Sequence, residues 1–335
     1  MDHSDPILPA AWIQDRKLLT HRKWSPASMA ALHVARQAIA QAGWSRAELA
    51  EAVLILGTSR GGAAGWLQPW PGRRAFPLMA ASNAMHGEAA AAISIELGIK
   101  GAYQVISTGC SAGLDAMGVA AMHLQCGIAP RALVVAVDLP MVKILLDGYA
   151  ATGILSKNYR NDPYHPETSG IFPAECAAAL TLESGVQNGV PRMIGYLANS
   201  DASDPLALDA DCGQLTALLT QAVESFGAPV ALSPHATGTA SHSKAETTVL
   251  CRAFPEQKPT LHLLKPFLGH GIGAGSLLET VILTEFLRHQ QLPPNRAGLH
   301  CPQNFQMPEI EQNATGPVYK IAASLGGHNS LVALQ

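Results

Sequence analysis

An internal duplication is the feature of this sequence that most restricts its fold. Two stretches repeat the same order of elements, in which helical periodicity alternates with short apolar runs such as AVLILG at 52–57 and APVALS at 228–233. Short uncharged runs of this kind predict strands that are buried on both faces. Two copies of the alternation therefore predict parallel sheets sandwiched between layers of helices, which is an α/β architecture.

Each copy follows the order helix, strand, helix, strand, helix. The first copy predicts helices at 28–48, 87–98 and 111–125 and strands at 52–57 and 103–107, and the second predicts helices at 214–226, 243–254 and 271–289 and strands at 228–233 and 261–265. We therefore divide the chain into a short N-terminal segment, 1–27, and two similar halves, 28–185 and 186–335. A site is expected where strand ends of the two halves meet.

Composition excludes some classes of protein and predicts an interface. Charged residues make up only 14% of the 335 residues, 48% are hydrophobic, and the formal net charge is -3. Without a basic stripe, the chain is not expected to bind nucleic acid. The shortage of charge predicts that part of the surface is covered by another subunit.

The sequence shows no targeting signal or membrane span. Its first residues, MDHSDPILP, include neither a basic n-region nor an apolar h-region, and no apolar run approaches the ~18 residues of a transmembrane helix. We expect a cytoplasmic protein.

One of the six cysteines is placed as a nucleophile. Cys110 follows a predicted strand and opens a predicted helix, between Gly109 and Gly113, which permit a sharp turn and a close approach of a ligand. The N–H groups at a helix N-terminus lower the pKa of a thiol, so we expect a depressed pKa here. The other cysteines form no CxxC pair and are interpreted as small buried residues: Cys126, Cys176, Cys212, Cys251 and Cys301.

Two histidines of the second half face this cysteine in the predicted arrangement. His235 and His270 each end a predicted strand and are followed by small residues. A lone histidine of this kind is usually a hydrogen-bonded core residue, but two at equivalent positions favour catalysis. Lys265 ends an apolar strand and needs a partner, for which Glu279 is the candidate. A buried salt bridge and a catalytic role remain equally open for that pair.

Neither a metal nor a cofactor is expected. His235 and His242 are seven residues apart, and the sequence contains no HxH or HExxH spacing.

Five segments, in order, resemble the beta-ketoacyl synthases, which are condensing enzymes with the thiolase-like fold. They are STGCSAGLDAMG (107–118), which is most similar to iterative polyketide ketosynthases, GIFPAECAAALTLE (170–183), HATGT (235–239) with Glu246, KPFLGHGIGAGSLLE (265–279) and SLGGHNSLVAL (324–334). The resemblance runs from about residue 28 to the end. It implies a thiolase-like fold with two pseudo-duplicated halves in a layered α-β-α-β-α sandwich.

The resemblance also implies a role for each matching residue. Cys110 would accept an acyl chain from an acyl-carrier protein, and His235 and His270 would donate hydrogen bonds to the thioester carbonyl of a malonyl extender. The oxyanion formed during condensation would be bound by the backbone N–H groups of Cys110 and Leu325. The supporting residues would be Lys265, held by Glu279, and Thr237 and Thr239, which would bind the phosphopantetheine arm. Such an enzyme would make fatty acids, polyenes or polyketides.

The sequence departs from the family pattern at several positions of the site. Ser243 stands where the family commonly has an aspartate, His328 replaces the threonine of GGTN, Ala174-Glu175-Cys176 replaces GEG, and Leu325 replaces the gating phenylalanine. These changes leave the acyl substrate and its chain length open.

Two readings of the function remain. The first is an active condensing enzyme, and the alternative is a ketosynthase-like partner subunit of the chain-length-factor type, which shapes the pocket of an active ketosynthase in a heterodimer. In both cases we expect a dimer, either a homodimer or a heterodimer with another ketosynthase-like chain. We expect it to form by pairing of the strand LVVAVD at 133–138 across the two-fold axis. A thiolase without decarboxylation fits the two-histidine pattern less well.

Overall fold

Two large sheets, one two-stranded sheet and three layers of helices build the described part of the chain. The computed structural model describes residues 10–335 except 69, 71–72, 74–84, 206–208 and 210. The expectation about a signal sequence falls on residues 1–9 and so lies outside the described residues. None of the helices in the described part of the chain is long and apolar enough to cross a membrane.

The first sheet contains four strands in the order β2-β1-β3-β4. Their bounds are β1 Val53–Gly57, β2 Tyr103–Ile106, β3 Arg131–Asp138 and β4 Cys176–Glu183. β1 pairs in parallel with β2 and β3, whereas β4 runs antiparallel to β3. The prediction of a parallel sheet is therefore wrong for β4, which runs antiparallel to its neighbour β3.

The second sheet contains five strands in the order β5-β11-β10-β6-β7. Their bounds are β5 Met193–Ser200, β6 Ala231–Ser233, β7 Thr260–Leu261, β10 Val318–Ala323 and β11 His328–Leu334. β10 and β11 form an antiparallel pair, and β6 joins β10 in parallel. A separate pair contains β8 Gln291–Leu292 and β9 Gln312–Asn313.

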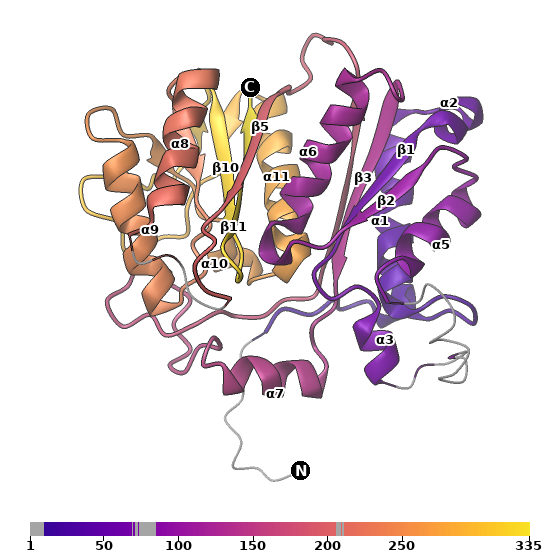
Figure 1. Cartoon of the computed structure of the whole chain (residues 1–335), viewed down its shortest axis with the longest axis horizontal. Coiled ribbons are helices and arrows are strands. Elements are labelled where there is room, and N and C mark those ends of the chain that lie inside the picture. The colour runs from indigo at the N-terminus through magenta and orange to yellow at the C-terminus, as the bar shows by residue number, and fades with distance from the viewer. Residues whose placement is uncertain (1–9, 69, 71–72, 74–84, 206–208, 210) are drawn as a thin grey trace.

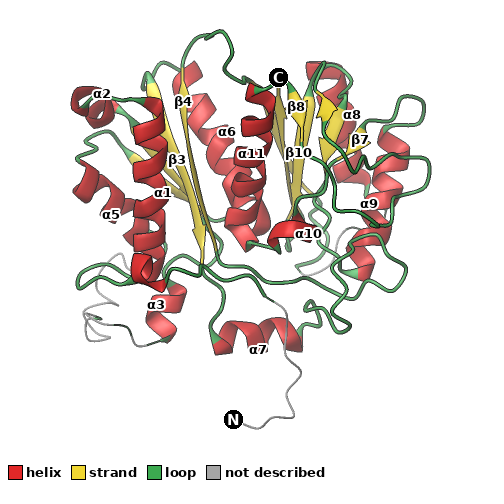
Figure 2. Ribbon diagram, turned by 180° about the vertical axis from the view of Figure 1, so that it is seen from behind, coloured by secondary structure: helices red, strands yellow, loops and turns green. Residues whose placement is uncertain are grey.

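The helices form one layer between the sheets and one layer on each outer face (Figures 1 and 2). Helices α6 Ala112–Gln125 and α11 Ile272–Arg288 lie between the sheets, α1 Pro26–Ala42 and α5 Glu88–Leu97 cover the first sheet, and α8 Gly213–Phe226 and α9 Ala240–Ala253 cover the second. The expected α-β-α-β-α sandwich is confirmed. The remaining helices are η1 Arg16–Leu19, α2 Arg46–Glu51, α3 Ala63–Leu67, η2 Gly109–Ser111, α7 Lys143–Ala151 and α10 Lys265–Leu268.

The period of two along the strands explains why both faces of each sheet are buried. On β1, Leu54 and Leu56 pack with α1 and α5, whereas Val53 and Ile55 pack with α6 and α11. On β10, Tyr319 and Ile321 face α8 and α9, and Ala322 faces the middle layer. Successive apolar residues therefore fill two separate cores, one on each face of the sheet. This is why the strand sequences do not alternate between apolar and polar residues.

Local signals fix where the first helices begin and end. Helix α1 begins after Ser25, whose hydroxyl accepts the N–H of Ser28, has Pro26 in its first turn, and ends at Gly43 with φ of 69°. The capping box of Ser45 and Glu48 starts α2 separately. The helix expected over 28–48 is therefore two helices, divided at Gly43.

The structure corrects the expected dimer strand. β3 contains LVVAVD and lies between β1 and β4, so both of its edges are occupied. The strand with one free edge next to the nucleophile turn is β2, which pairs with β1 among the described residues and whose Tyr103 is 41% exposed.

Candidate active site

The nucleophile turn connects β2 to α6. Cys110 lies in the single 3-10 turn η2, and Gly109 before it has φ of 62°, which favours glycine. A Cβ at Gly113, by contrast, would lie 2.7 Å from the backbone nitrogen of Leu277, so this glycine permits contact between α6 and α11. The two glycines that flank Cys110 thus serve a turn and a helix crossing.

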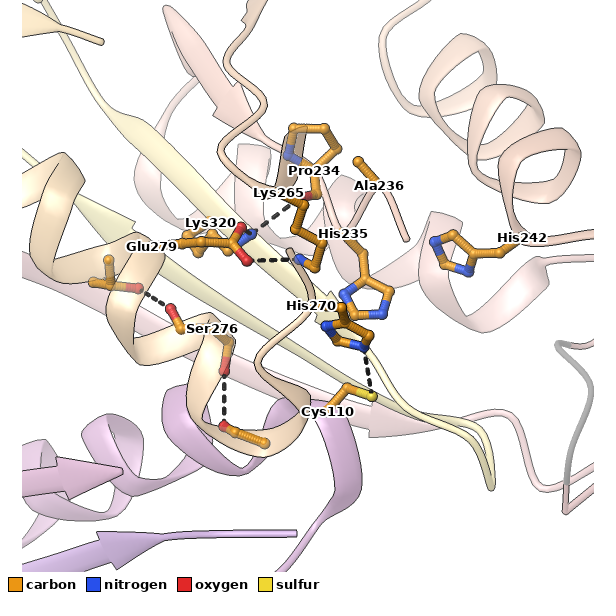
Figure 3. A network of polar contacts seen from close by, with 12 residues as sticks. Cys110, Pro234, His235, Ala236, His242, Lys265, His270, Ser276, Glu279 and Lys320 are labelled. Carbon is orange, nitrogen blue, oxygen red and sulfur yellow. Dashed lines mark hydrogen bonds and ion pairs between the residues drawn. The ribbon is translucent and has the colours of Figure 1, made fainter. Parts of the chain in front are cut away.

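The thiol of Cys110 meets the imidazole of His270. The Nε2 atom of His270 lies 3.3 Å from Sγ, and the rings of His235 and His270 are 5.6 Å apart between centroids (Figure 3). One potential ligand atom from each of Cys110, His235 and His270 lies within 4.8 Å of the others. The structure therefore brings together the three residues that the sequence proposed, although the two histidines come from different loops of the second half.

The pKa predicted for Cys110 is wrong in direction. Burial raises the pKa of the thiol to about 11, and the positive charges of Lys265 and Arg60 only partly oppose this effect. The thiol is therefore protonated at neutral pH, and a base must remove its proton when it attacks.

Both histidines are neutral. Burial, reinforced by the charge of Lys265, holds the pKa of His235 and of His270 well below the usual value. Each ring has a buried Nδ1 without a hydrogen-bond partner among the described residues. No protein group therefore fixes the tautomer through Nδ1, and each Nε2 is available to accept or donate a proton.

Glu246 holds the loop that carries His235. Its carboxylate accepts the backbone N–H groups of His235 at 2.7 Å and Ala236 at 2.9 Å and the hydroxyl of Tyr164 at 2.9 Å. Ala236 has φ of 45°, a left-handed conformation that is strained for alanine. His235 follows β6 closely, whereas His270 follows α10 and does not end a strand, contrary to the prediction.

A buried carboxylate shared by two lysines lies beside the histidines. Lys265 Nζ donates to Glu279 Oε1 at 2.7 Å, and Lys320 Nζ donates to Oε2 at 2.5 Å and to the carbonyl of Pro234 at 3.0 Å (Figure 3). The expected Lys265–Glu279 pair is present, but Lys265 begins α10 instead of ending a strand. Lys320 was missed, although a lysine within VYKIAA is itself a signal of a buried partner.

The last hairpin is tied to the nucleophile turn through Ser324. Its hydroxyl donates to the carbonyl of Thr108 at 2.6 Å and accepts the N–H of Ser111 at 2.8 Å. Leu325 follows, in a turn closed by a hydrogen bond from the N–H of Gly327 to the carbonyl of Ser324. The loop of Leu325 is thereby held against Cys110.

A cavity of about 430 Å³ connects these groups. It is lined by Cys110, His235, His270, Thr237, Thr239 and Leu325 from the predicted set, together with Arg60, Tyr149, Ile154, Ile171, Ile272 and others. This volume lies in the range of small-molecule sites, about 300–1,000 Å³. Lys265 and Glu279 lie behind the histidines and are not among its lining residues.

The three ligand atoms at the cavity are close enough together to hold a metal ion. Their mutual distances, within 4.8 Å, are compatible with a zinc ion bound by one thiolate and two imidazoles. Spacing along the chain predicted no metal site, but the fold brings together ligand atoms that lie far apart in the sequence. Metal binding would still require a thiolate at Cys110, whose pKa is raised to about 11, in a site where Lys265 already places a positive charge.

The remaining cysteines divide into buried and exposed residues. Cys176 and Cys212 are buried as expected, but Cys126, Cys251 and Cys301 are exposed, and all six are free. The expectation of buried residues is wrong for those three because each lies near a helix end or in a loop at the surface.

Models of two protein families match most of the chain. The model described as "Beta-ketoacyl synthase, N-terminal domain" matches residues 14–188, and the model described as "Beta-ketoacyl synthase, C-terminal domain" matches residues 192–298.

Curated proteins with similar sequences have related names. Over 67% of this chain, the "Highly reducing polyketide synthase ALT1" of Alternaria alternata is 28% identical, and the chain covers 9% of that protein. Over 78% of this chain, the "3-oxoacyl-[acyl-carrier-protein] synthase 2" of Mycobacterium bovis is 24% identical, with 68% of that protein covered. The chloroplastic "3-oxoacyl-[acyl-carrier-protein] synthase I" of Arabidopsis thaliana is 25% identical over 72% of this chain, and 56% of it is covered.

Solved structures with the same architecture are ketosynthases. A chain of the complex described as "AntDE:AntF (apo): type II PKS acyl-carrier protein in complex with its ketosynthase bound to the hexaketide" superposes with a TM-score of 0.83 at 21% identity, over 97% of this chain and 87% of that one. "The ishigamide ketosynthase/chain length factor" superposes with a TM-score of 0.78 at 21% identity, again over 97% and 87% of the two chains. At these identities the likeness shows the fold, and it confirms the thiolase-like prediction.

Proposed function

Because the chain belongs to the beta-ketoacyl synthase family, we propose that it catalyses the decarboxylative condensation of an acyl group on Cys110 with a malonyl group carried by an acyl-carrier protein. One observation carries the proposal: the reactive atoms of Cys110, His235 and His270 converge within 4.8 Å at the wall of one cavity. Acyl transfer needs a nucleophile, and decarboxylation needs hydrogen-bond donors at the carbonyl of the malonyl thioester, so these three residues can serve both steps at one point.

Acyl transfer to Cys110 is the first step. Neutral His270, with Nε2 at 3.3 Å from Sγ, takes the thiol proton while the sulfur attacks the acyl thioester of the carrier. The bond between the carbonyl carbon and the pantetheine sulfur breaks, and the proton returns to that leaving sulfur. Because the pKa of the thiol is raised and that of His270 is lowered, the proton moves to Nε2 as the sulfur attacks, and no separate thiolate forms beforehand.

Decarboxylation is the second step. After acyl transfer, His270 exchanges protons with water and reaches the tautomer with its proton on Nε2. The Nε2–H groups of His235 and His270 then donate to the carbonyl oxygen of the malonyl thioester, and the bond to the carboxylate carbon breaks to release carbon dioxide. Its electron pair forms an enolate on the thioester. Because both imidazoles are neutral, they act as hydrogen-bond donors to the developing negative charge.

Condensation is the third step. The enolate carbon attacks the acyl carbonyl on Cys110, a carbon–carbon bond forms, and the bond to Sγ then breaks. The leaving sulfur takes one proton from water and becomes the thiol again. The tetrahedral intermediate of this attack carries a negative oxygen, which is proposed to accept hydrogen bonds from the backbone N–H groups of Cys110 and Leu325. The hydrogen bonds of Ser324 hold these two segments together. Among the described residues, the N–H of Leu325 donates to no backbone carbonyl.

The supporting residues act through charge and position. Lys265 and Lys320 on Glu279 keep the surroundings of the histidines positive, which lowers the pKa of both rings. Thr237 and Thr239 line the cavity and are proposed to bind the phosphopantetheine arm of the carrier. No metal or other cofactor takes part in these steps.

The alternative role as a chain-length-factor-type partner subunit is not favoured by the site. Such a role needs no acylated cysteine, whereas here the cysteine and both histidines converge on one cavity. We propose a dimer, homo- or heterodimeric, formed at the free edge of β2, where Tyr103 is exposed. A cytoplasmic location is part of the proposal and is supported by the free state of all six cysteines.

Separate assays of the two half-reactions test the proposal. After incubation with acyl-carrier protein, peptide mass mapping should find the acyl group on Cys110, and Cys110→Ala should not be acylated. His235→Ala should lose malonyl decarboxylation and keep acyl transfer. His270→Ala should lose both to a large extent, because the Nε2 atom of His270 contacts the thiol. Acylation at another residue, or unchanged carbon dioxide release in both histidine variants, would contradict these roles.

A further inference from the structure

A guanidinium group lies in the wall of the reaction cavity and is not used by the three steps above. Arg60 follows β1 and lines the same cavity as Cys110, His235 and His270. We infer that Arg60 selects acyl chains that carry a further oxygen acceptor, a keto carbonyl in the first instance, over plain alkyl chains of equal length. This inference rests on the proposed function and names its substrate class.

The backbone of Arg60 is held firmly. Buried Asp138 accepts the N–H of Arg60 at 2.7 Å, the N–H of Ser59 at 2.9 Å and the hydroxyl of Thr58 at 3.1 Å. The same carboxylate accepts the N–H of Gly273 at the start of α11 at 2.9 Å. The turn that presents Arg60 is thereby fixed to the element that follows His270, so the guanidinium has a defined position relative to the site.

The side chain of Arg60 is oriented by one neighbour. Its Nε donates to the hydroxyl of Tyr149 at 2.9 Å, and its Cζ lies 5.5 Å from the centroid of that ring. Tyr149 belongs to α7 and is itself buried, in a cluster with Leu155, Ile171 and Ile272. The guanidinium plane is therefore set against an aromatic face at the edge of an apolar wall.

The terminal nitrogens of Arg60 remain free for a ligand. Within the described residues they donate no hydrogen bond, and no carboxylate forms an ion pair with the guanidinium. Neither terminal nitrogen is a fully buried atom, so both retain accessible surface. A guanidinium has five N–H donors in a fixed fork, of which Tyr149 takes one. The other four have no hydrogen-bond partner in the part of the chain that the structure describes.

The rest of this wall is apolar. Ile154, Ile171 and Ile272 line the cavity beside Tyr149 and Arg60. An alkyl chain along this wall would bury its carbons well but would also cover the guanidinium without giving it a hydrogen bond, which costs free energy. A chain with an oxygen at the right position avoids that cost and gains a charge-assisted hydrogen bond.

The acyl chain, and not the malonyl carboxylate, is the fitting partner. Decarboxylation removes the negative charge from the carboxylate and moves it to the enolate oxygen. A cation bound to the carboxylate would stabilise the malonyl group more than the transition state and would slow the step. A cation bound to an oxygen of the acyl chain is unaffected by this charge movement.

Acyl transfer from synthetic thioesters tests the inference. Hexanoyl-, 3-oxohexanoyl- and 5-oxohexanoyl-pantetheine are matched in length, and acylation of Cys110 is followed by intact-protein mass spectrometry. The wild-type protein should react about tenfold or more faster with at least one oxo thioester than with hexanoyl thioester, as expected for a hydrogen bond to a charged group. Arg60→Met should lose this preference, so that the three thioesters react at similar rates, although the loss of the charge that lowers the pKa of Cys110 should slow all three. Arg36→Met, on the exposed face of α1, is the matched control and should retain the preference.

Tyr149→Phe provides a second variant if Arg60→Met fails to fold. It keeps the ring and the charge, removes the acceptor of Nε, and should give an intermediate preference. Equal rates for all thioesters in the wild-type protein, or a preference that survives in Arg60→Met, would overturn the inference while hexanoyl transfer to Cys110 still supported the proposed function. Failure of every thioester to acylate Cys110 would overturn both.

Discussion

Lys320 Nζ lies 2.5 Å from Glu279 Oε2, and Lys265 occupies the other oxygen of the same carboxylate at 2.7 Å. Two buried cations therefore share one buried anion. Burial and the competing charge of Lys265 lower the pKa of Lys320 to about 8, while Glu279 opposes this effect. The triad has one excess positive charge beside the histidines, and the fold depends on Glu279 to tolerate it.

Replacement of the shared carboxylate should be more harmful than replacement of one lysine. Glu279→Gln leaves two buried ammonium groups without an anion and should lower the free energy of unfolding by about 3–5 kcal/mol. Lys320→Met leaves a balanced Lys265–Glu279 pair and should cost clearly less. Urea denaturation of both variants measures the difference. Equal losses would show that the two lysines do not share Glu279 in the manner described.

Cys110 should react slowly with iodoacetamide at neutral pH. Its thiol has a pKa raised to about 11 by burial, so the thiolate fraction rises with pH up to that value. Exposed Cys126, Cys251 and Cys301 should be labelled first at pH 7, and the rate at Cys110 should still increase between pH 8 and 10. Peptide mass mapping over a pH series gives each rate. Preferential labelling of Cys110 at pH 7 would contradict the raised pKa and support the low pKa predicted from its position at the start of a helix.

The two alanine substitutions at Gly113 and Gly148 should have opposite effects. A Cβ at Gly113 would lie 2.7 Å from the backbone nitrogen and 2.8 Å from the Cβ of Leu277, so Gly113→Ala should separate α6 from α11 and cost about 1–3 kcal/mol. Gly148 lies in α7 with nothing within 4 Å of an added Cβ, so Gly148→Ala should gain up to about 1 kcal/mol of helix stability. Thermal unfolding compares them, and a neutral Gly113→Ala would refute the close crossing.

His328 should make stability depend on pH. Its Nε2 lies 2.9 Å from Asp115 Oδ2, and this carboxylate raises the pKa of His328 above its usual value of 6.5. A raised pKa in the folded state gives stability that is fully present below pH 6.5 and is lost as pH rises through the folded value.

The contribution of His328 is about 1 kcal/mol or less, because the side chain is about a third exposed. His328→Gln should remove this part of the pH dependence when urea denaturation at pH 5.5 is compared with that at pH 8.5. An unchanged difference between the two pH values would exclude the pair as its source.

The sequence alone was sufficient to predict those site residues that a local pattern identifies. Cys110, His235 and His270 each lie in short glycine-containing segments that follow or precede apolar runs, and these segments are recognisable without the fold. The duplication likewise predicted the layers. The direction of β4 and β11 was missed because antiparallel return strands are apolar runs like any other, and only pairing distinguishes them.

Long-range contacts account for what the sequence could not provide. Asp138 and Lys320 hold site loops through partners 78 and 86 residues away, and nothing near either residue indicates these partners. The raised pKa of Cys110 depends on burial by both halves, which outweighs the local effect of a helix start. The internal position of LVVAVD likewise follows from sheet order, which periodicity does not determine.

Protein acylated at Cys110 should carry out the whole condensation. Protein acylated at Cys110 is mixed with malonyl-acyl-carrier protein, and both chains are weighed by mass spectrometry while carbon dioxide is measured. We predict that the acyl group leaves Cys110 and appears on the carrier as a 3-oxoacyl thioester two carbons longer, with one carbon dioxide released per product. Carbon dioxide release without transfer of the acyl group, or return of the acyl group to solvent as the free acid with no longer product, would contradict it.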